Sequence, residues 1–363
     1  MQALILVGGQ GTRLQPLTLT TPKPAVPLVD RPFIAYMLDW LASHGIDDVI
    51  MACGFRAADL RSALGDRAAS GARISYLEES EPLGTAGPVR LAADEGLLAE
   101  RFCVLNGDLL TDIDLSRTIA AHAEHEATAT ISLHPVDDPA PFGLVRRSDA
   151  GEVTDFLEKP DPSEIDTDEV NAGVYVLERE IVERIPSGRS VSIEREVFPG
   201  LIGQGVYGVR LDGYWVDIGT PERYLQASWD ILEGTVETEL GALTDASDIL
   251  VSPGASVDPE AELIGPAFVG DGAILRAGAR VERAVVATGV EISEDATVSG
   301  SVLLRDCRLG RAAEVEGSIL APQVQVESGA RVPPGSVVGA SARIDAGAEL
   351  DADARVAPGK VAR

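Results

Sequence analysis

The sequence predicts an α/β protein in which a Rossmann-like, mostly parallel sheet is followed by a parallel β-helix. Three observations support this fold class. The first 235 or so residues alternate strand-like and helix-like segments, branched apolar residues recur every six positions from about Val251, and the chain has 363 residues. Because one core rarely extends over so long a chain, we expect two domains. Their expected bounds are residues 1–235 and 251–363, with a linker at 236–250.

The first domain is expected to begin with a buried strand, because residues 3–7 form a short apolar run. Apolar side chains then recur at helical spacing over residues 34–41, and Gly45 is suited to end that helix. Strands are expected at 48–52, 73–77 and 102–105, with helices at 57–64 and after Thr85. Such alternation is typical of a parallel sheet covered by helices, whose ligands bind beyond the carboxyl ends of the strands.

The C-terminal part carries a hexapeptide repeat. Small residues and turn formers fill the gaps between the apolar positions, and three one-residue slips interrupt the period. Eighteen such positions, at about three per coil, predict roughly six coils of a parallel β-helix. The repeat positions are Val257, Leu263, Val269, Leu275, Val281, Val286, Ile292, Val298, Leu304, Leu309, Val315, Leu320, Val326, Val332, Val338, Ile344, Leu350 and Val356.

The net charge of −28 argues against nucleic acid and anionic membranes as partners, because both are polyanions. Lysine is nearly absent, with Lys23, Lys159 and Lys360 as its only three occurrences. This acidic, lysine-poor composition suggests adaptation to a salty cytoplasm. Compositional drift in a GC-rich genome is an equally good explanation.

A cytoplasmic location is expected from three further features. Met1 leads directly into the first strand instead of a signal peptide, and no apolar stretch approaches the 18 residues of a membrane span. Cys53, Cys103 and Cys307 are scattered without metal-binding spacing, as expected for free thiols in a reducing compartment.

A glycine-rich turn at the end of the first strand predicts a phosphate-binding loop. Its candidate nucleotide-binding residues are Leu6, Gly8, Gly9, Gly11, Thr12 and Arg13. Glycines let the backbone approach a ligand, and the cations of Arg13 and Lys23 would face a triphosphate. The Walker A pattern is excluded because Gly-Lys-Ser/Thr is missing, and the dinucleotide fingerprint because its third glycine is missing. A generic glycine turn remains the alternative.

Two aspartates are candidate metal ligands. Asp108 follows an expected strand in an Asn-Gly-Asp turn, and Asp217 precedes an expected helix. Two carboxylates that leave room for water and phosphate suit Mg²⁺, although each aspartate alone more often caps a helix or ends a turn.

The glycine loop followed by Pro22-Lys23-Pro24 resembles the signature of the sugar-1-phosphate nucleotidylyltransferases. The resemblance extends over nearly the whole chain. It implies that Asp108 and Asp217 bind the metal, and that the β-helix is left-handed. The stretch at residues 191–199 is also similar to mannose-1-phosphate guanylyltransferases that carry a β-helix tail. These expectations imply GTP and a sugar 1-phosphate as substrates, with Mg²⁺ as the cofactor.

The same resemblance assigns the sugar-phosphate site. Glu158 and Lys159 match the Glu-Lys-Pro motif, in which the lysine holds the sugar phosphate, and Asn171 matches a motif that binds sugar hydroxyls. Gly143 would lend its backbone to the sugar. Without these flanking matches, a solvated Glu-Lys pair would be the simpler interpretation.

Glu79, with Gly84 and Thr85, is expected to contact the base. Uridylyl and thymidylyl members of the family carry glutamine where this chain has Glu79. A carboxylate only accepts hydrogen bonds, and guanine offers two neighbouring donors, so Glu79 favours GTP. The alternative is that Glu79 faces solvent and Glu78 or Glu81 reads the base.

Three other functions remain open. The nearest is a glucose-1-phosphate uridylyl- or thymidylyltransferase. An acyltransferase site in the β-helix would need a histidine, but His44, His122, His125 and His134 all precede the repeats. A non-catalytic regulatory paralogue would have lost the motifs that are present here. An exposed β-helix end also leads us to expect a homo-oligomer.

Overall fold

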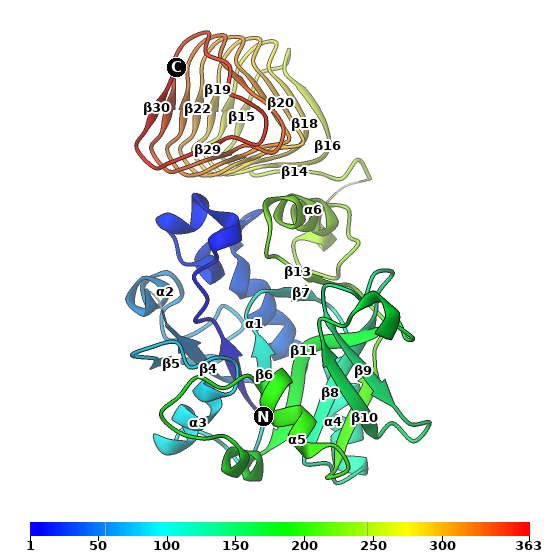
Figure 1. Cartoon of the computed structure of the whole chain (residues 1–363). Coiled ribbons are helices and arrows are strands. Elements are labelled where there is room, and N and C mark those ends of the chain that lie inside the picture. Colours follow the sequence, from blue (N-terminus) through cyan, green and yellow to red (C-terminus); the bar gives the residue numbers. More distant parts are fainter. Residues whose placement is uncertain (55, 245) are drawn as a thin grey trace. The chain divides into compact units, whose positions relative to one another are not determined.

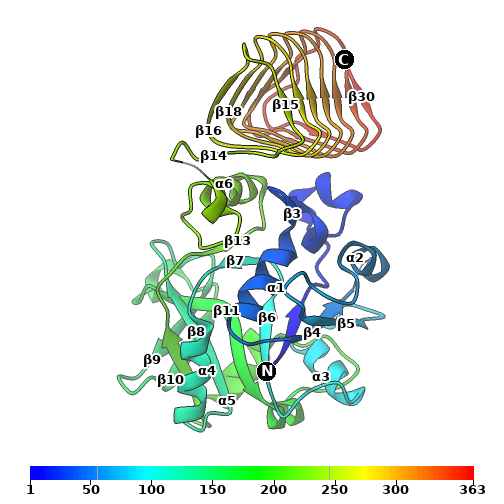
Figure 2. The same cartoon turned by 180° about the vertical axis from the view of Figure 1, so that it is seen from behind.

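The computed structural model describes residues 1–54, 56–244 and 246–363. Within it the chain forms two compact units, drawn from opposite sides in Figure 1 and Figure 2. The first unit comprises Met1–Gly9 and Ile34–Trp215, and the second comprises Gln10–Phe33 and Val216–Arg363. The domain bounds expected from the sequence stay a prediction.

A parallel half-sheet forms the centre of the first unit. Its order is β5 (Arg73–Glu78), β4 (Asp48–Cys53), β1 (Gln2–Leu6) and β6 (Arg101–Asn106). All neighbours in this half run parallel, as predicted. Leu4 and its neighbours in β1 are fully buried, which explains why this strand reads as a continuous apolar run.

The rest of the same sheet is mixed. Strand β11 (Glu169–Glu178) runs antiparallel to β6 and to β8 (Ala129–Pro135). Strands β9 (Gly143–Arg147) and β10 (Val153–Glu158) form an antiparallel pair, and β12 (Val206–Arg210) runs parallel to β8. Short connections such as the one between β9 and β10 are too short for a parallel crossover. Two short strands are β7 (Leu109–Thr111) and β13 (Trp215–Asp217).

Helices flank this sheet, as Figure 1 and Figure 2 show. Each of the expected helices is present: α1 spans Phe33–Ser43, α2 Ala57–Leu64 and α3 Gly87–Asp94. Helix α3 contributes Val89 and Ala92 to the main core. Helix α4 (Leu115–Glu124) is capped by Asp114, whose side chain accepts a hydrogen bond from the Ser116 N–H, and α5 spans Phe198–Leu201.

The second unit includes a small hairpin and one long helix. Strands β2 (Pro27–Leu28) and β3 (Arg31–Pro32) pair antiparallel. Helix α6 (Pro221–Leu232) begins after Thr220, with proline at its first position. The buried Tyr224 hydroxyl donates to the Pro27 carbonyl at 2.5 Å, so α6 is bound to the hairpin.

The remainder of the second unit is a parallel β-helix, which confirms the expected architecture. Its strands form two parallel sheets, visible as stacked coils in Figure 1. The larger sheet divides at β18 (Arg280–Val286), which pairs with one following strand through Arg280–Glu282 and with another through Val285–Val286, so the strands lie in three rows. Equivalent residues recur every 17 or 18 positions, so that Leu275 pairs with Ile292 and Ile292 with Leu309. The strands are β14 (Ile249–Val251), β15 (Ser256–Val257), β16 (Glu262–Val269), β17 (Ile274–Leu275), β18 (Arg280–Val286), β19 (Glu291–Ile292), β20 (Thr297–Ser299), β21 (Val302–Leu303), β22 (Arg308–Leu309), β23 (Glu314–Glu316), β24 (Ile319–Leu320), β25 (Gln325–Val326), β26 (Arg331–Val332), β27 (Val337–Val338), β28 (Arg343–Ile344), β29 (Arg355–Val356) and β30 (Val361–Ala362).

One repeat position differs from the sequence pattern. Leu303, and not Leu304, continues the stacked row between Val286 and Leu320. Leu304 instead lines a cavity of about 630 Å³ in the second unit, together with Phe268. Both leucines are buried, so hydrophobicity alone does not distinguish them.

In the part of the chain that the structure describes, no helix is long and apolar enough to cross a membrane.

Candidate active site

The glycine loop and Glu79 lie together in the first unit. Leu6 ends β1, and a Cβ built on Gly8 would lie only 2.9 Å from Glu79 Oε1. The other carboxylate oxygen, Oε2, accepts a hydrogen bond from the Leu83 N–H at 3.0 Å. Gly8 therefore allows a close approach between the loop and a half-buried carboxylate.

The environment of Glu79 differs from that of its acidic neighbours. Glu78 and Glu81 are exposed, whereas Glu79 is half-buried. Burial raises the pKa of the Glu79 carboxyl, and its hydrogen bond from the Leu83 N–H acts in the opposite direction. Of these three acidic residues, Glu79 has the geometry of a fixed acceptor at the edge of the loop.

The segment that carries Gly84 and Thr85 is joined to a distant stretch of chain. Gly84 has a φ of +76°, and a Cβ there would lie 2.5 Å from the Val191 carbonyl oxygen. The Thr85 hydroxyl donates to Glu194 Oε2 at 2.6 Å and accepts from the Ile193 N–H at 2.8 Å. The candidate nucleotide segment is thus held in place by residues 191–194.

The expected sugar-phosphate residues gather at the end of the β9–β10 pair. Gly143 pairs with Glu158 across the two strands, and a Cβ on Gly143 would lie 2.8 Å from Glu158 Oε2. Lys159 is exposed and has a φ of +56°, which is unusual for a residue with a side chain. The Lys159 N–H donates to the Phe142 carbonyl at 3.1 Å.

Glu158 is half-buried, and this burial raises the pKa of its carboxyl. The negative charge of Glu194 raises that pKa further, while the cations of Arg195 and Lys159 lower it. The carboxyl group therefore sits between a like charge and two opposite charges.

Asn171 is held near the Asn106–Asp108 turn. Asn171 Oδ1 accepts from the Gly173 N–H at 2.9 Å. Gly173 has a φ of +70°, and a Cβ on it would lie 2.5 Å from Asn106 Nδ2. Asp108, two residues after Asn106, is half-buried at the end of β6. The structure therefore brings the Asn-Gly-Asp turn close to the predicted sugar-binding asparagine.

The second unit holds the remaining loop residues. Gly11 has a φ of +61°, and a Cβ there would lie 3.0 Å from Thr18 Cγ2 and 3.1 Å from Lys23 Cβ. Thr18, which is buried, donates to the Gly11 carbonyl at 2.8 Å. Thr12 and Arg13 begin a short 3₁₀ turn and are exposed.

Arg13 and Asp217 are brought together beside Gly219. A Cβ on Gly219 would collide with the Arg13 guanidinium and would lie 2.7 Å from Asp217 Oδ1. Asp217 Oδ2 pairs with Arg223, in the first turn of α6. Its Oδ1 is buried and has no hydrogen-bond partner within the described residues. A buried carboxylate oxygen left without a donor is costly unless a ligand completes it.

The predicted site residues are divided between the two units. The first unit holds Leu6, Gly8, Gly9, Glu79, Gly84, Thr85, Asp108, Gly143, Glu158, Lys159 and Asn171, and the second holds Gly11, Thr12, Arg13, Lys23 and Asp217. Across residues 1–54, 56–244 and 246–363, no three side chains of His, Cys, Asp or Glu form a metal-binding group.

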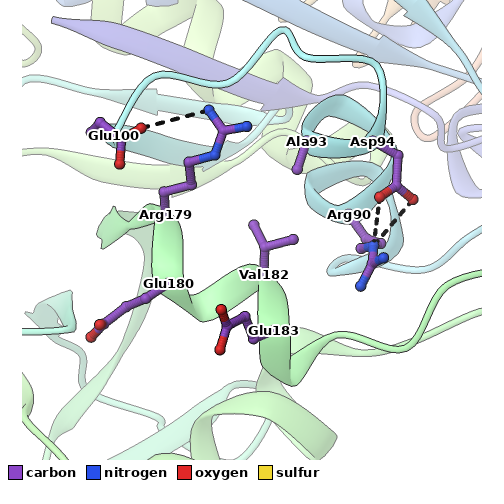
Figure 3. A pocket seen from close by; sticks show the side chains of 8 residues that line it. All are labelled: Arg90, Ala93, Asp94, Glu100, Arg179, Glu180, Val182 and Glu183. Atoms are coloured by element: carbon purple, nitrogen blue, oxygen red, sulfur yellow. Dashed lines mark hydrogen bonds and ion pairs between the residues drawn. The ribbon is translucent and has the colours of Figure 1, made fainter.

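The first unit also contains a cavity of about 520 Å³, which is lined by other residues. Figure 3 shows both arginines of its lining in ion pairs, Arg90 with Asp94 and Arg179 with Glu100. These pairs measure 2.9 Å and 3.8 Å. No predicted site residue lines this cavity, and its cations are already neutralised, so we do not assign it to substrate.

Sequence reasoning missed two side chains that shape the site. Glu194 lies in a stretch noted only for its resemblance, yet it contacts Thr85. Trp215 donates its indole N–H to the Ala172 carbonyl at 2.8 Å and packs edge-on against Phe142, with ring centres 5.2 Å apart. Trp215 thereby connects the Asn171 and Gly143 segments. Its position two residues before Asp217 was the available signal.

Comparison with known proteins identifies the family. The sequence profile described as "Nucleotidyl transferase" matches residues 2–234, and the one described as "GMPPB C-terminal domain" matches residues 246–333. The chain belongs to the nucleotidyl transferase family. Membership explains why the glycine loop, the acidic turn and the Glu-Lys-Pro motif occur in one chain.

Curated members of this nucleotidyl transferase family share most of the chain. A mannose-1-phosphate guanylyltransferase of Mycobacterium tuberculosis is 40% identical over 80% of this chain and 81% of its own length. Mannose-1-phosphate guanylyltransferase 1 of Arabidopsis thaliana is 36% identical over 90% and 92%. The mannose-1-phosphate guanyltransferase of Candida albicans is 34% identical over 90% and 93%.

One solved structure is also similar. The crystal structure of HddC from Yersinia pseudotuberculosis has a TM-score of 0.54 and 27% sequence identity, covering 62% of this chain and 97% of that chain.

Proposed function

We propose that this nucleotidyl transferase makes GDP-mannose and pyrophosphate from GTP and mannose 1-phosphate. The observation that carries the proposal is the half-buried Glu79 carboxylate, fixed by the Leu83 N–H against the Gly8 backbone. Guanine would present its N1–H and exocyclic amine to the two carboxylate oxygens. The names of the curated relatives support the same pair of substrates.

The chemistry needs positioning and charge neutralisation more than proton transfer. A phosphate oxygen of the sugar phosphate attacks the α-phosphorus of GTP, and the bond to pyrophosphate breaks in line. The attacking phosphate is largely dianionic near neutral pH, because its second pKa is about 6, so no general base is required. Rate enhancement then comes from orientation and from fixed positive charge.

The basic residues supply this positive charge. Arg13 and Lys23, both in the second unit, would hold the triphosphate. Lys159 would hold the sugar phosphate, with its position set by the Phe142 carbonyl and its positive φ. In a protein with a net charge of −28, these local cations are needed to bind two anionic substrates.

A divalent cation fits the acidic residues. Asp217 Oδ1, buried without a hydrogen-bond partner in the described residues, is available as a ligand. We assign Mg²⁺ to Asp108 and Asp217, because Mg²⁺ is commonly held by one or two carboxylates together with substrate phosphates. When bound, the ion would neutralise charge on the α-phosphate.

We also propose a cytoplasmic homo-oligomer. Within the described residues, β30 is the last strand of its sheet and pairs with β28, and its Val361 is exposed. An uncovered ladder end presents backbone groups that a second copy can pair with. Neither nucleic acid nor membrane is expected as a partner, because of the net charge.

The test is a substrate matrix of ATP, GTP, CTP and UTP against mannose, glucose and galactose 1-phosphates. Pyrophosphate release measures each combination. We expect GTP with mannose 1-phosphate to have the highest kcat/KM. A preference for UTP with glucose 1-phosphate would replace this proposal by the uridylyltransferase alternative, and inactivity in every combination would favour a regulatory role.

A further inference from the structure

Glu194 occupies a buried position between two parts of the candidate site. It lies on a single π-helical turn, Ile193–Val197, and only 9% of its surface is exposed. Such turns are rare and often occur at functional sites. The turn packs against β10, the strand that ends at Glu158.

One oxygen of Glu194 binds the nucleotide side. Glu194 Oε2 accepts from the Thr85 hydroxyl at 2.6 Å and from the Ser192 hydroxyl at 2.8 Å. The segment is further joined by the Ala86 N–H, which donates to the Val191 carbonyl at 2.9 Å. A change at Glu194 would therefore act directly on Thr85.

The other oxygen faces the sugar side. The Tyr175 hydroxyl donates to Glu194 Oε1 at 3.5 Å and accepts from Asn171 Nδ2 at 2.7 Å. Tyr175 is fully buried, and its ring packs edge-on against Phe198 with centres 4.9 Å apart. Its hydroxyl is therefore held in one place between Glu194 and Asn171.

This arrangement is poorly explained by stability alone. The Glu194 carboxylate has three hydroxyl donors, yet within the described residues no lysine or arginine pairs with it. A buried charge without an opposite charge is costly. Its field also raises the pKa of the Glu158 carboxyl, which disfavours the ionised form of a predicted sugar-binding residue.

We propose that Glu194 is a positioning residue that couples the nucleotide and sugar-phosphate subsites. Through Thr85 on one oxygen, and Tyr175 with Asn171 on the other, it makes the geometry of each subsite depend on the other. The proposal rests on the function proposed above, because it takes Thr85 and Asn171 as substrate-binding residues. It adds a connection between them that neither motif contains.

The first variant is Glu194→Gln, which keeps the shape but replaces one acceptor with a donor. We expect the KM for both substrates to rise together, by about three- to tenfold each, because one hydroxyl contact is lost or inverted. The matched control is Glu196→Gln on the same turn. Glu196 is exposed, pairs with Arg189 and accepts from the Ser192 N–H, so it reports local damage to the turn alone.

The second measurement is a double-mutant cycle of Thr85→Val and Tyr175→Phe. If Glu194 couples the subsites, Tyr175→Phe will raise the KM for GTP as well as for the sugar phosphate. The two changes will be non-additive by about two- to fivefold, as for residues in one hydrogen-bond network. In the Glu194→Gln background we expect this non-additivity to disappear. If Glu194→Gln does not fold, the double-mutant cycle in the otherwise unchanged enzyme still tests the proposal.

Two results would overturn the proposal. One is strict additivity of the Thr85 and Tyr175 variants in the otherwise unchanged enzyme. The other is a Glu194→Gln protein with lower thermal stability but unchanged KM values. The assays use whichever substrate pair is most active in the substrate matrix. A preference for another pair would therefore refute the proposed substrates without deciding the role of Glu194.

Discussion

The substitution Glu79→Gln tests how the base is chosen. The side chain keeps its size, and its amide oxygen can still accept from the Leu83 N–H, which lies 3.0 Å from Glu79 Oε2. The amide nitrogen then takes the place of Oε1, the atom nearest Gly8. At that position the amide N–H of glutamine would face an N–H donor of guanine, whereas uracil offers a carbonyl acceptor to the same amide.

The expected change in selectivity between GTP and UTP follows from one mispaired hydrogen-bonding group beside the half-buried side chain at position 79. Leaving such a group unsatisfied costs about 1–3 kcal/mol, which corresponds to roughly 5- to 150-fold in selectivity. Burial also raises the pKa of the Glu79 carboxyl. The ionised form, in which both oxygens act only as acceptors, is therefore lost at a higher pH than for an exposed glutamate, and the preference for GTP should weaken on mild acidification.

The assay is the ratio of kcat/KM for GTP to that for UTP, with the sugar phosphate held constant. Glu78→Gln and Glu81→Gln are matched controls, because both side chains are exposed. We expect the ratio to fall only in Glu79→Gln. An unchanged ratio in Glu79→Gln with a fall in either control would assign base reading to that neighbour and refute our reasoning.

Three further predictions concern the metal, the charge and the β-helix. Asp108→Asn and Asp217→Asn should each remove most activity but leave the circular dichroism spectrum unchanged; near-normal turnover at saturating Mg²⁺ would refute the metal assignment. At a net charge of −28, screening of self-repulsion should raise the Tm as KCl increases, and a flat or falling Tm would contradict adaptation to salt. Removing residues 251–363 should lower stability or change assembly while GTP binding persists, and a stable truncated protein that has lost GTP binding would place part of the nucleotide site in the β-helix.

Local patterns predicted much of the fold. The expected helix at 57–64 has the same bounds as α2, and the first strand follows from its apolar run. Periodicity also predicted the β-helix, because a repeated coil leaves the same signal many times. The hexapeptide pattern could not decide between Leu303 and Leu304 as the repeat position, because either of two adjacent leucines fits the period beside a one-residue slip.

Contacts between distant segments were harder to predict. Thr85 and Glu194 are separated by 109 positions, and no local rule joins a hydroxyl to a carboxylate over that span. The proximity of Arg13 to Asp217 beside Gly219 was equally hard to predict, because it depends on the tertiary packing of two segments about 200 residues apart in the sequence. The antiparallel pairing of β9 with β10 was also not predicted, because the alternation indicated a mostly parallel sheet, whereas no helix separates these two strands.

The nearly constant coil length, 17 or 18 residues, makes the β-helix modular. Ile292 pairs with Leu309, and Leu309 with Val326, each one coil further along. Loss or duplication of one whole coil would leave every apolar row continuous, whereas a change of a few residues would misalign all the rows after it. The family profile for this region ends at residue 333, yet the coils continue to β30 at Val361–Ala362. The length of this domain can therefore change in evolution by whole coils, independently of the predicted substrate-binding residues, all of which precede the repeats.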